Sequence, residues 1–298
     1  MGKIIVLGSI NMDVVVTAPR HPQIGETIFG NEVHFIPGGK GSNQAVAAAR
    51  LDGEVQLIGK LGEDAFGNEL EQFLSSEKLD LKHLSRSASA PTGTAMITVN
   101  HDSENTIIVI SGSNMEITPA DVQNVVIRPD TVLVSQFEVP QNVLYVLTQK
   151  ARDAGAKTVL NPAPAGPFID GLLDTIDYLV VNETELAYFA AAPLTEDIDE
   201  LTTNAKKLRT RRDQTIIVTL GANGLLCVQD EDVTIVEGRK TNALDTTGAG
   251  DCFVGALAVA LSEGMALIQA LQFANRAAAI SVTRLGASSS MPYRHELE

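Results

Sequence analysis

The stretch Asp245-Thr246-Thr247-Gly248-Ala249-Gly250-Asp251 precedes an apolar run of helical length, Cys252–Leu261. Its small residues predict a turn, and the run predicts a helix that begins near Gly248–Gly250. Unpaired backbone N–H groups at a helix N-terminus bind anions. Asp251 then stands where a carboxylate could take a proton from a hydroxyl beside that anion, and Asp245 is free to face a cation. An ordinary helix start with Asp in its first turn is the alternative.

Short runs rich in Val, Ile and Leu alternate with helical patterns along the chain. The expected strands are Ile4–Ser9, Val55–Ile58, Thr131–Ser135, Lys157–Asn161, Tyr178–Val181 and Thr215–Leu220. The expected helices include Gln44–Leu51, Asn68–Ser76, Gln141–Ala154, Asp199–Arg211 and Ala266–Val282. This alternation predicts a Rossmann-like α/β fold, with a mostly parallel central sheet flanked by helices.

Polar residues follow several of these strands. They are Asn11 and Asp13 after the first strand, Glu138 after Val132–Phe137, Asn182 after Tyr178–Val181, and Gly221 after Ile216–Leu220. Ligands of parallel sheets bind beyond the carboxyl ends of the strands. The sequence therefore predicts that these residues converge on one site.

Two stretches, 14–36 and 92–111, break the alternation with extended β patterns. We expect them to pair into a small separate sheet, which could cover the site as a lid and exclude water. An ordinary edge hairpin is the alternative. Because no repeat or linker interrupts the sequence, we expect one domain over residues 1–298 with this β-sheet lid.

Composition narrows the function classes. The formal net charge of −15 over 298 residues argues against a nucleic-acid partner. An acidic protein that binds phosphates must use backbone N–H groups, a few Lys or Arg side chains and a divalent metal. Cys227 and Cys252 lack metal-ligand spacing, so we expect free thiols in a reducing compartment. Without a signal peptide or a membrane-spanning stretch, the sequence predicts a cytoplasmic protein with no membrane contact.

A second glycine-rich loop, Pro37-Gly38-Gly39-Lys40-Gly41-Ser42-Asn43, leads into the helical pattern Gln44–Leu51. Its glycines permit close approach of the backbone to a ligand, while Lys40 and Asn43 add directed donors. It is not a Walker A loop, because His34 stands where that motif requires its first Gly and no Ser or Thr directly follows Lys40. A glycine-rich turn before a helix is the alternative.

Together the two loops resemble the paired signature motifs of the ribokinase (phosphofructokinase-B type) family of carbohydrate kinases. They occur in the order of that family and near opposite ends of the chain. The segments Gly8–Asp13, Asn161–Ala165, Asn182–Glu185 and Thr219–Gly224 also resemble it. The likeness extends from about Ile4 to Pro292.

The resemblance implies ATP-dependent phosphorylation of the 5-hydroxyl of D-ribose, giving D-ribose 5-phosphate, with Mg²⁺ and an activating monovalent cation, usually K⁺. It implies that Asp251 is the catalytic base and that Gly248, Ala249 and Gly250 form the anion hole. The pentose-binding positions are matched by Asn11, Met12, Asp13, Gly39, Lys40, Gly41, Ser42, Asn43 and Glu138, beside Asp251. It also implies a homodimer joined through the lid sheets.

The nucleotide-binding positions are matched by Asn182, Glu185, Thr219, Leu220, Gly221, Ala222, Asn223, Gly224 and Asn275, together with Gly250 and Asp251. Glu185 lies in the segment that the family ties to Mg²⁺ and phosphate. The loop positions for the monovalent cation are matched by Asp245, Thr247, Ser281, Arg284, Gly286 and Ser290. Asn275-Arg276 replaces the more usual His-Ala-type pair near adenine, which leaves nucleotide preference open.

Other functions stay open at this point. A deoxyribokinase is the nearest alternative, although Asn11 and Asp13 suit a substrate with a 2-hydroxyl group. The loop Gly38–Asn43 disfavours a nucleoside kinase or fructokinase. A non-catalytic sugar or nucleotide sensor on the same fold has no need of Asp251, so the intact carboxylate and anion hole favour an enzyme.

Overall fold

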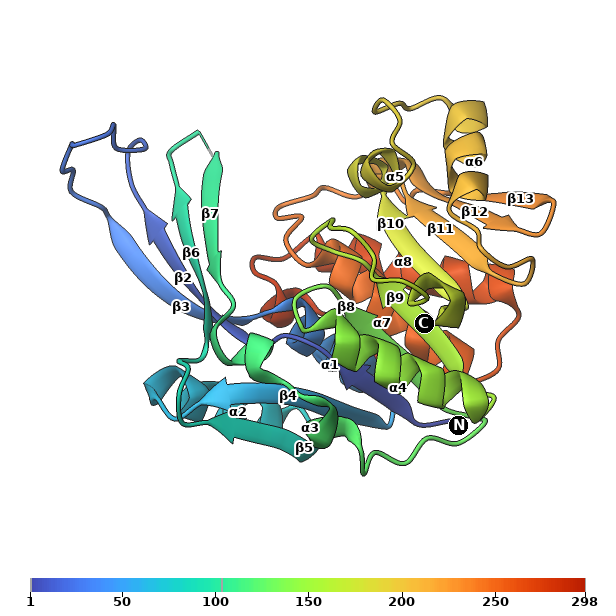
Figure 1. The fold of residues 1–298 in the computed structure, drawn as a ribbon. Coiled ribbons are helices and arrows are strands. Elements are labelled where there is room, and N and C mark those ends of the chain that lie inside the picture. Colours follow the sequence, from blue (N-terminus) through green and yellow to red (C-terminus); the bar gives the residue numbers. More distant parts are fainter. Residues whose placement is uncertain (1, 103, 298) are drawn as a thin grey trace.

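The described residues form two β-sheets (Figure 1). The computed structural model describes residues 2–102 and 104–297, so Met1, Glu298 and Ser103, which belongs to the predicted lid segment 92–111, lie outside the described residues. The larger sheet has the strand order β13-β12-β11-β10-β9-β8-β1-β4-β5, and the smaller one has the order β3-β2-β6-β7. The predicted α/β fold with a separate small sheet is confirmed.

The larger sheet is parallel from β5 to β11 and ends in an antiparallel hairpin. Its strands are β1 (Ile4–Leu7), β4 (Val55–Gly62), β5 (Asp80–Ser87), β8 (Val132–Gln136), β9 (Lys157–Asn161), β10 (Tyr178–Asn182), β11 (Thr215–Thr219), β12 (Gly224–Gln229) and β13 (Asp232–Glu237). The six buried parallel strands β1, β4, β8, β9, β10 and β11 were predicted, since covered parallel strands are continuously apolar. The edge strand β5 and the hairpin β12–β13 were not.

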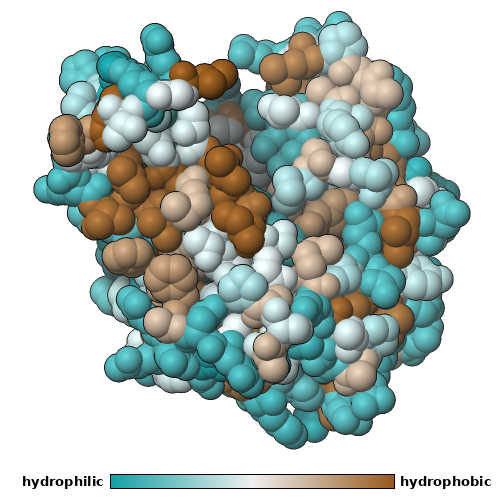
Figure 2. All heavy atoms as spheres, turned by 60° about the vertical axis from the view of Figure 1, so that its left-hand side comes forward, coloured by the Kyte–Doolittle hydropathy of each residue, from teal (hydrophilic) through white to brown (hydrophobic). Residues whose placement is uncertain are grey.

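The smaller sheet, called the lid below, contains β2 (Asn11–Thr17), β3 (Glu32–Gly38), β6 (Gly93–Val99) and β7 (Asn105–Ile110). It projects from the main body (Figure 1) and carries a gathering of hydrophobic side chains (Figure 2). Strand β2 starts three residues earlier than the predicted segment 14–36. Asn11 and Asp13 therefore belong to the lid, at the point where it leaves the main sheet.

Helices cover both faces of the larger sheet. One face bears α1 (Lys40–Arg50), α2 (Ala65–Ser76), α7 (Ala249–Ser262) and α8 (Leu267–Ser281). The other bears α3 (Pro119–Val122), α4 (Gln141–Asp153), α5 (Glu183–Phe189) and α6 (Ile198–Lys207). Side chains of β1 alternate between the two cores, as strand geometry requires: Ile4 packs in the first and Ile5 in the second.

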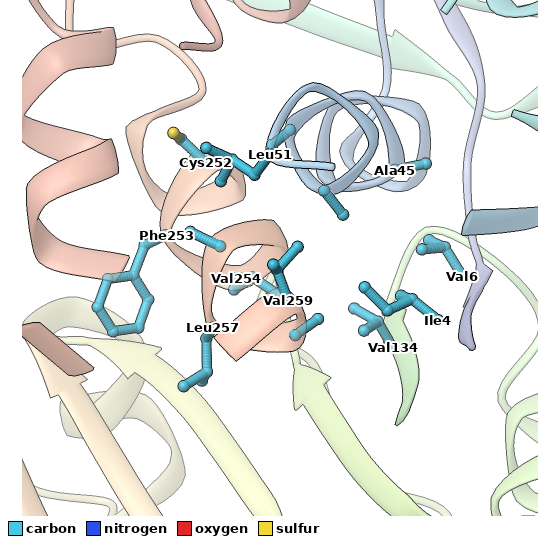
Figure 3. Close-up of a cluster of buried hydrophobic side chains, with 14 of the residues drawn as sticks. Ile4, Val6, Ala45, Leu51, Val134, Cys252, Phe253, Val254, Leu257 and Val259 are labelled. Carbon is cyan, nitrogen blue, oxygen red and sulfur yellow. The ribbon is translucent and has the colours of Figure 1, made fainter. Parts of the chain in front are cut away.

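Helices α1 and α7 pack closely beside β1 and β8 (Figure 3). Helix α7 is buried along almost its whole length, which explains why its sequence is apolar all round. A Cβ atom at Gly255 would lie 2.5 Å from the backbone oxygen of Gln44 and 2.8 Å from the Cβ atom of Ala47. The missing side chain lets the two helices approach, and this brings their N-termini together.

Two further features of the described residues concern the cysteines and the apolar helices. Cys227 and Cys252 are free and buried, and burial raises the pKa of each thiol to about 12. Among the helices of residues 2–102 and 104–297, none has both the length and the apolar character needed to traverse a bilayer.

Candidate functional site

A cavity of about 200 Å³ lies where α1 and α7 begin and where β9, β10 and β11 end. Both predicted glycine-rich loops and several predicted strand ends contribute to its wall. The lining residues are Lys40, Asn161, Ala163, Val180, Val181, Asn182, Glu185, Thr219, Gly248, Gly250 and Asp251. The fold therefore brings together segments that are far apart in the sequence.

The turn before α7 has the predicted form. Gly248 is the N-cap residue with φ of 75°, a left-handed conformation that glycine adopts without strain. The N–H groups of Gly250 and Asp251 donate no backbone hydrogen bond among the described residues outside the regular elements. Together with the helix dipole they make this end of α7 suitable for a phosphate group.

Asp251 lies in the first turn of α7 and is only 7% exposed. Its Oδ2 accepts a hydrogen bond of 3.0 Å from Asn43 Nδ2, and its Oδ1 accepts one of 2.9 Å from Gln44 Nε2. Both donors lie near the start of α1, which begins at Lys40. The carboxylate is thus held from two sides at the edge of the cavity.

The second glycine-rich loop packs directly on the end of β1. Gly39 has φ of 89°, and a Cβ atom there would lie 2.7 Å from the backbone nitrogen of Asn11. Ser9 donates its hydroxyl to Glu138 and accepts on its backbone oxygen a 2.9 Å bond from the N–H of Ser42. Ser9 was not predicted as a site residue from the sequence, although it is a polar residue that follows the strand β1.

Asn11 and Asp13 occupy the same side of β2, because side chains alternate along a strand. A Cβ atom at Gly38 would lie 2.2 Å from Asp13 Oδ2, so the missing side chain makes room for this carboxylate. Met12 points the other way into the hydrophobic core and reaches the site only through its backbone.

Asn114 was also missed by sequence reasoning. It lies in a short 3₁₀ helix, Gly112–Glu116, and is buried. Its Nδ2 donates a 2.7 Å bond to Asn11 Oδ1, while its Oδ1 accepts a 3.0 Å bond from the N–H of Ile10. Asn114 therefore fixes the orientation of the Asn11 amide and leaves Asn11 Nδ2 to donate elsewhere.

Carboxylates surround a single ammonium group in the site. Burial raises the pKa of Asp13 to about 7, and the nearby charges of Glu138 and Asp251 add to the shift. Burial acts to lower the pKa of Lys40, but Asp251, Glu138, Glu185 and Asp13 outweigh it and raise that pKa. The site thus carries excess negative charge, which a ligand rich in hydroxyl donors would relieve.

Asn182 and Glu185 form a capping box at the start of α5. Glu185 N–H donates a 2.7 Å bond to Asn182 Oδ1, and Asn182 N–H donates a 3.0 Å bond to Glu185 Oε2. Burial raises the pKa of Glu185 despite this bond and the nearby Lys40. Both side chains line the cavity that contains Asp251, so capping does not remove them from the site.

The other predicted nucleotide positions are distributed around the end of β11. Thr219 lines the cavity, and Gly221, Ala222 and Asn223 form a 3₁₀ turn after it. Leu220 packs in the hydrophobic core, and a Cβ atom at Gly224 would lie 2.0 Å from the backbone oxygen of Val236. Asn275 Nδ2 donates a 2.9 Å bond to the backbone oxygen of Glu237, at the end of β13.

Asp245 joins the turn before α7 to the loop 281–290. Its carboxylate accepts a 2.9 Å bond from Thr247 N–H and a 2.8 Å bond from Gly286 N–H. Burial opposes the ionised form, but these bonds prevail and lower the pKa of Asp245. Arg284 turns its guanidinium to Glu296, and the Ser290 hydroxyl donates to the backbone oxygen of Ala287. Ser281 accepts the N–H of Arg284 on its carbonyl.

The variant Asp13→Asn tests whether the site carries excess negative charge. Because the folded protein raises the pKa of Asp13 from 3.8 to about 7, it binds more protons than the unfolded chain in that window. The contribution of Asp13 to the free energy of unfolding of the wild type therefore falls as the pH rises from the lower to the higher of these two pKa values. We expect the variant to gain free energy of unfolding relative to wild type between roughly pH 4 and pH 7, measured by urea denaturation of the ligand-free protein.

The matched control is Asp80→Asn, because hydrogen bonds from Lys3 and Lys82 overcome burial and lower the pKa of Asp80. That variant should be destabilised equally at roughly pH 5 and pH 8, both above the ordinary aspartate pKa. A stability difference for Asp13→Asn that does not change with pH would show that the carboxyl group is not held protonated.

Comparisons with known proteins agree with this geometry. Residues 1–294 match the family model described as pfkB family carbohydrate kinase. A ribokinase of Haemophilus influenzae is 37% identical over 293 residues, which cover 98% of this chain and 95% of that protein. A ribokinase of Mus musculus is 36% identical, with 99% and 93% covered.

Solved structures show the same architecture. The structure of Arabidopsis thaliana ribokinase complexed with ribose and ATP superposes with a TM-score of 0.90 at 31% identity, covering 99% of this chain and 97% of that one. The ribokinase of Thermotoga maritima gives a TM-score of 0.87 at 33% identity, with 100% and 98% covered. The paired glycine loops, the fold and these full-length matches agree: the chain belongs to the pfkB family of carbohydrate kinases.

Proposed function

We propose that this chain transfers the γ-phosphoryl group of ATP to the 5-hydroxyl of D-ribose. The observation that carries the proposal is the position of Asp251. This buried carboxylate lies at the N-terminus of α7 and close to the carboxylates of Asp13 and Glu138. Full-length similarity to ribokinases of bacteria and mammals supports the sugar.

The sugar site is supported by the donors and acceptors at the start of β2. A carboxylate such as Asp13 can accept hydrogen bonds from two vicinal hydroxyls, and Asn11 Nδ2 is left to donate to a third oxygen. Hydroxyl donors also relieve the repulsion among Asp13, Glu138 and Asp251. A polyhydroxyl ligand with a 2-hydroxyl group satisfies this arrangement better than a deoxy sugar, which would leave acceptors unpaired.

In the proposed reaction Asp251 accepts the proton of the sugar 5-hydroxyl as that oxygen forms a bond to the γ-phosphorus of ATP. The bond between this phosphorus and the bridging oxygen breaks, and the electron pair leaves with ADP. The N–H groups at the start of α7 and the Lys40 ammonium are suited to stabilise charge on the transferred group. The lid, adjoining the sugar site, would exclude water that otherwise competes as acceptor.

Glu185 would hold Mg²⁺ in this proposal, because its carboxylate lines the same cavity as Gly248 and Gly250 and carboxylate oxygens are ligands that Mg²⁺ prefers. When bound with the nucleotide, the ion would neutralise part of the negative charge of the nucleotide phosphates. The proposed substrates and the two free, buried thiols suit a cytoplasmic enzyme.

Asp251→Asn should lower kcat for ribose by several orders of magnitude, because it removes the proton acceptor and preserves the shape of the side chain. Coupled measurement of ADP release gives kcat, and calorimetry gives the affinities for ribose and ATP, which we expect to change little. Asp80→Asn is the control, since Asp80 lies outside the cavity. Near-normal turnover by Asp251→Asn would remove Asp251 from the role of base.

The same assay with 2-deoxyribose, fructose and nucleosides separates the alternatives. We expect kcat/KM to be highest for ribose. Wild-type protein that binds ribose and ATP without releasing ADP would be a sensor, and this outcome would contradict the proposed enzyme.

We also propose that a monovalent cation such as K⁺ binds between the turn before α7 and the loop 281–290. Asp245 spans the two segments, and the carbonyl oxygens of Thr247, Arg284 and Gly286 accept no backbone hydrogen bond among the described residues outside the regular elements. Such oxygens, with an ionised carboxylate nearby, suit a large cation. The ion would hold the turn in shape and aim its N–H groups without touching substrate.

Potassium should therefore raise kcat or nucleotide affinity and leave ribose affinity almost unchanged. Rb⁺, Cs⁺ and NH₄⁺ should replace it in part, while Na⁺ and Li⁺ should not, all as chlorides at about 100 mM to equalise screening. Asp245→Ala should abolish the response. Asp197→Ala is the control, because Asp197 also accepts two backbone N–H groups but caps α6. Equal activity of the wild type with and without K⁺ would contradict the proposed cation site.

The lid is proposed to join two copies of the chain. Strand β7 is an unpaired edge of the smaller sheet, and all its described residues are exposed. Hydrophobic side chains gather on the lid (Figure 2), and its exposed apolar residues are Ile107, Ile108, Val109 and Ile110 of β7, Met96 of the neighbouring β6, and Val33 and Phe35 of β3 at the opposite edge. Exposed apolar edge strands associate with other strands unless they are covered.

Ile108→Lys should convert the dimer to a monomer, because it places a charge on a side chain that is 67% exposed in the isolated chain and would be buried in the pair. Ile235→Lys is the control, since Ile235 is an exposed residue on β13, the edge of the other sheet. Analytical ultracentrifugation measures the mass. A monomeric wild type, or a monomeric Ile235→Lys beside a dimeric Ile108→Lys, would contradict the lid interface.

A further inference from the structure

Four buried side chains form a hydrogen-bond network that extends on both sides of Asp251. On one side Gln136 Nε2 donates a 2.6 Å bond to Gln44 Oε1, and Gln44 Nε2 donates to Asp251 Oδ1. On the other side Ser288 Oγ donates a 2.6 Å bond to Asn43 Oδ1, and Asn43 Nδ2 donates to Asp251 Oδ2. Each carboxylate oxygen thus receives one amide donor, and each amide is itself held by an outer donor.

The direction of these hydrogen bonds explains the role of Gln136, the outer residue next to Gln44. A glutamine amide carries an acceptor and a donor that differ little in shape, so Gln44 could present either end to Asp251. A carbonyl oxygen turned to Asp251 would repel the carboxylate. Because Gln136 supplies an N–H to Gln44 Oε1, that oxygen is held away from Asp251 and the Nε2 group faces it.

Gln136 is retained at a cost to stability. It is fully buried at the end of β8, and its Oε1 has no hydrogen-bond partner among the described residues. A Cβ atom at Gly8 would lie 2.1 Å from that oxygen, so the backbone of Gly8 leaves room for the side chain. A buried acceptor without a partner is unfavourable, and an apolar residue would avoid the penalty.

We propose that Gln44 and Gln136 are positioning residues that fix the carboxylate of Asp251 for proton transfer. The Gln136 side chain donates its hydrogen bond to Gln44 and not to the carboxylate, although its backbone lies beside the cavity residue Asn161 on the neighbouring strand. In this proposal Gln136 acts on Asp251 through Gln44. The inference rests on the proposed function, in which Asp251 is the base. A base displaced by a fraction of an ångström loses rate and leaves substrate affinity intact, because alignment matters most in the transition state.

Gln44→Met and Gln136→Met test the proposal, since Met has nearly the same length and no amide. We expect kcat to fall about tenfold to a hundredfold in Gln44→Met, the range for losing a hydrogen bond to a charged group. Gln136→Met should lower it by roughly threefold to tenfold. The KM values for ribose and ATP should stay within about twofold in both variants.

The double variant supplies the decisive readout. Because Gln136 acts only through Gln44, Gln136→Met should have no further effect on kcat in the Gln44→Met background. A merely structural role would instead add its loss in either background. If Gln44→Met fails to fold, Gln136→Met alone still carries the test through its kcat and KM values.

Gln56→Met is the matched control, because Gln56 is a buried glutamine whose Nε2 donates a 2.8 Å bond to Asp80, away from the cavity. It should lower thermal stability and leave kcat unchanged. Unchanged kcat in folded Gln44→Met, or equal losses from Gln136→Met in both backgrounds, would overturn the inference. A wild type without ribose-dependent ADP release would instead contradict the proposed function, so the two failures are distinguishable.

Discussion

The close approach of the N-terminal halves of α1 and α7 is the contact on which the site depends. Gly255 allows the helix backbones to meet, and Asn43 and Gln44 then reach Asp251 across the contact. One glycine-rich loop precedes each helix, so the same packing brings the turn that we propose binds phosphate beside the loop that we propose binds the sugar. Neither loop could form the site alone, because each supplies only one of the two groups that must meet.

Charge is the second constraint. Several carboxylates share a small, partly buried volume with one lysine, and burial together with the charges of Glu138 and Asp251 raises the pKa of Asp13. Such a site is unfavourable when empty and improves when hydroxyl groups or cations enter it. The protein gives up stability here so that binding energy is available to a ligand with the complementary pattern of donors.

Much of the fold follows from local sequence rules. The buried strands are short apolar runs, and the two helix starts carry glycines where the backbone needs a positive φ or a close contact. Strand β5 was missed because Asp80, Lys82 and Arg86 interrupt its apolar pattern, as an edge strand permits. The hairpin β12–β13 was missed because it follows β11 without an intervening α-helix and so lies outside the alternation of strands and helices.

Long-range polar pairs set the limit of prediction at the site. Asn114 orients Asn11 from 103 residues away, and Gln136 orients Gln44 from 92 residues away. A hydrogen bond between distant segments leaves no periodic trace in the sequence, and a single Asn or Gln carries no spacing signal. The residues proposed to face the ligand come from motifs, whereas those that hold them in place required the fold.

A crystal structure of the chain with ribose and a non-hydrolysable ATP analogue tests the central claim most directly. We predict that the ribose 5-hydroxyl lies within hydrogen-bond distance of an Asp251 oxygen, with the γ-phosphate at the N–H groups that begin α7 and both amide bonds to Asp251 intact. A sugar bound with its 5-hydroxyl away from Asp251, or a γ-phosphate away from that turn, would contradict the account.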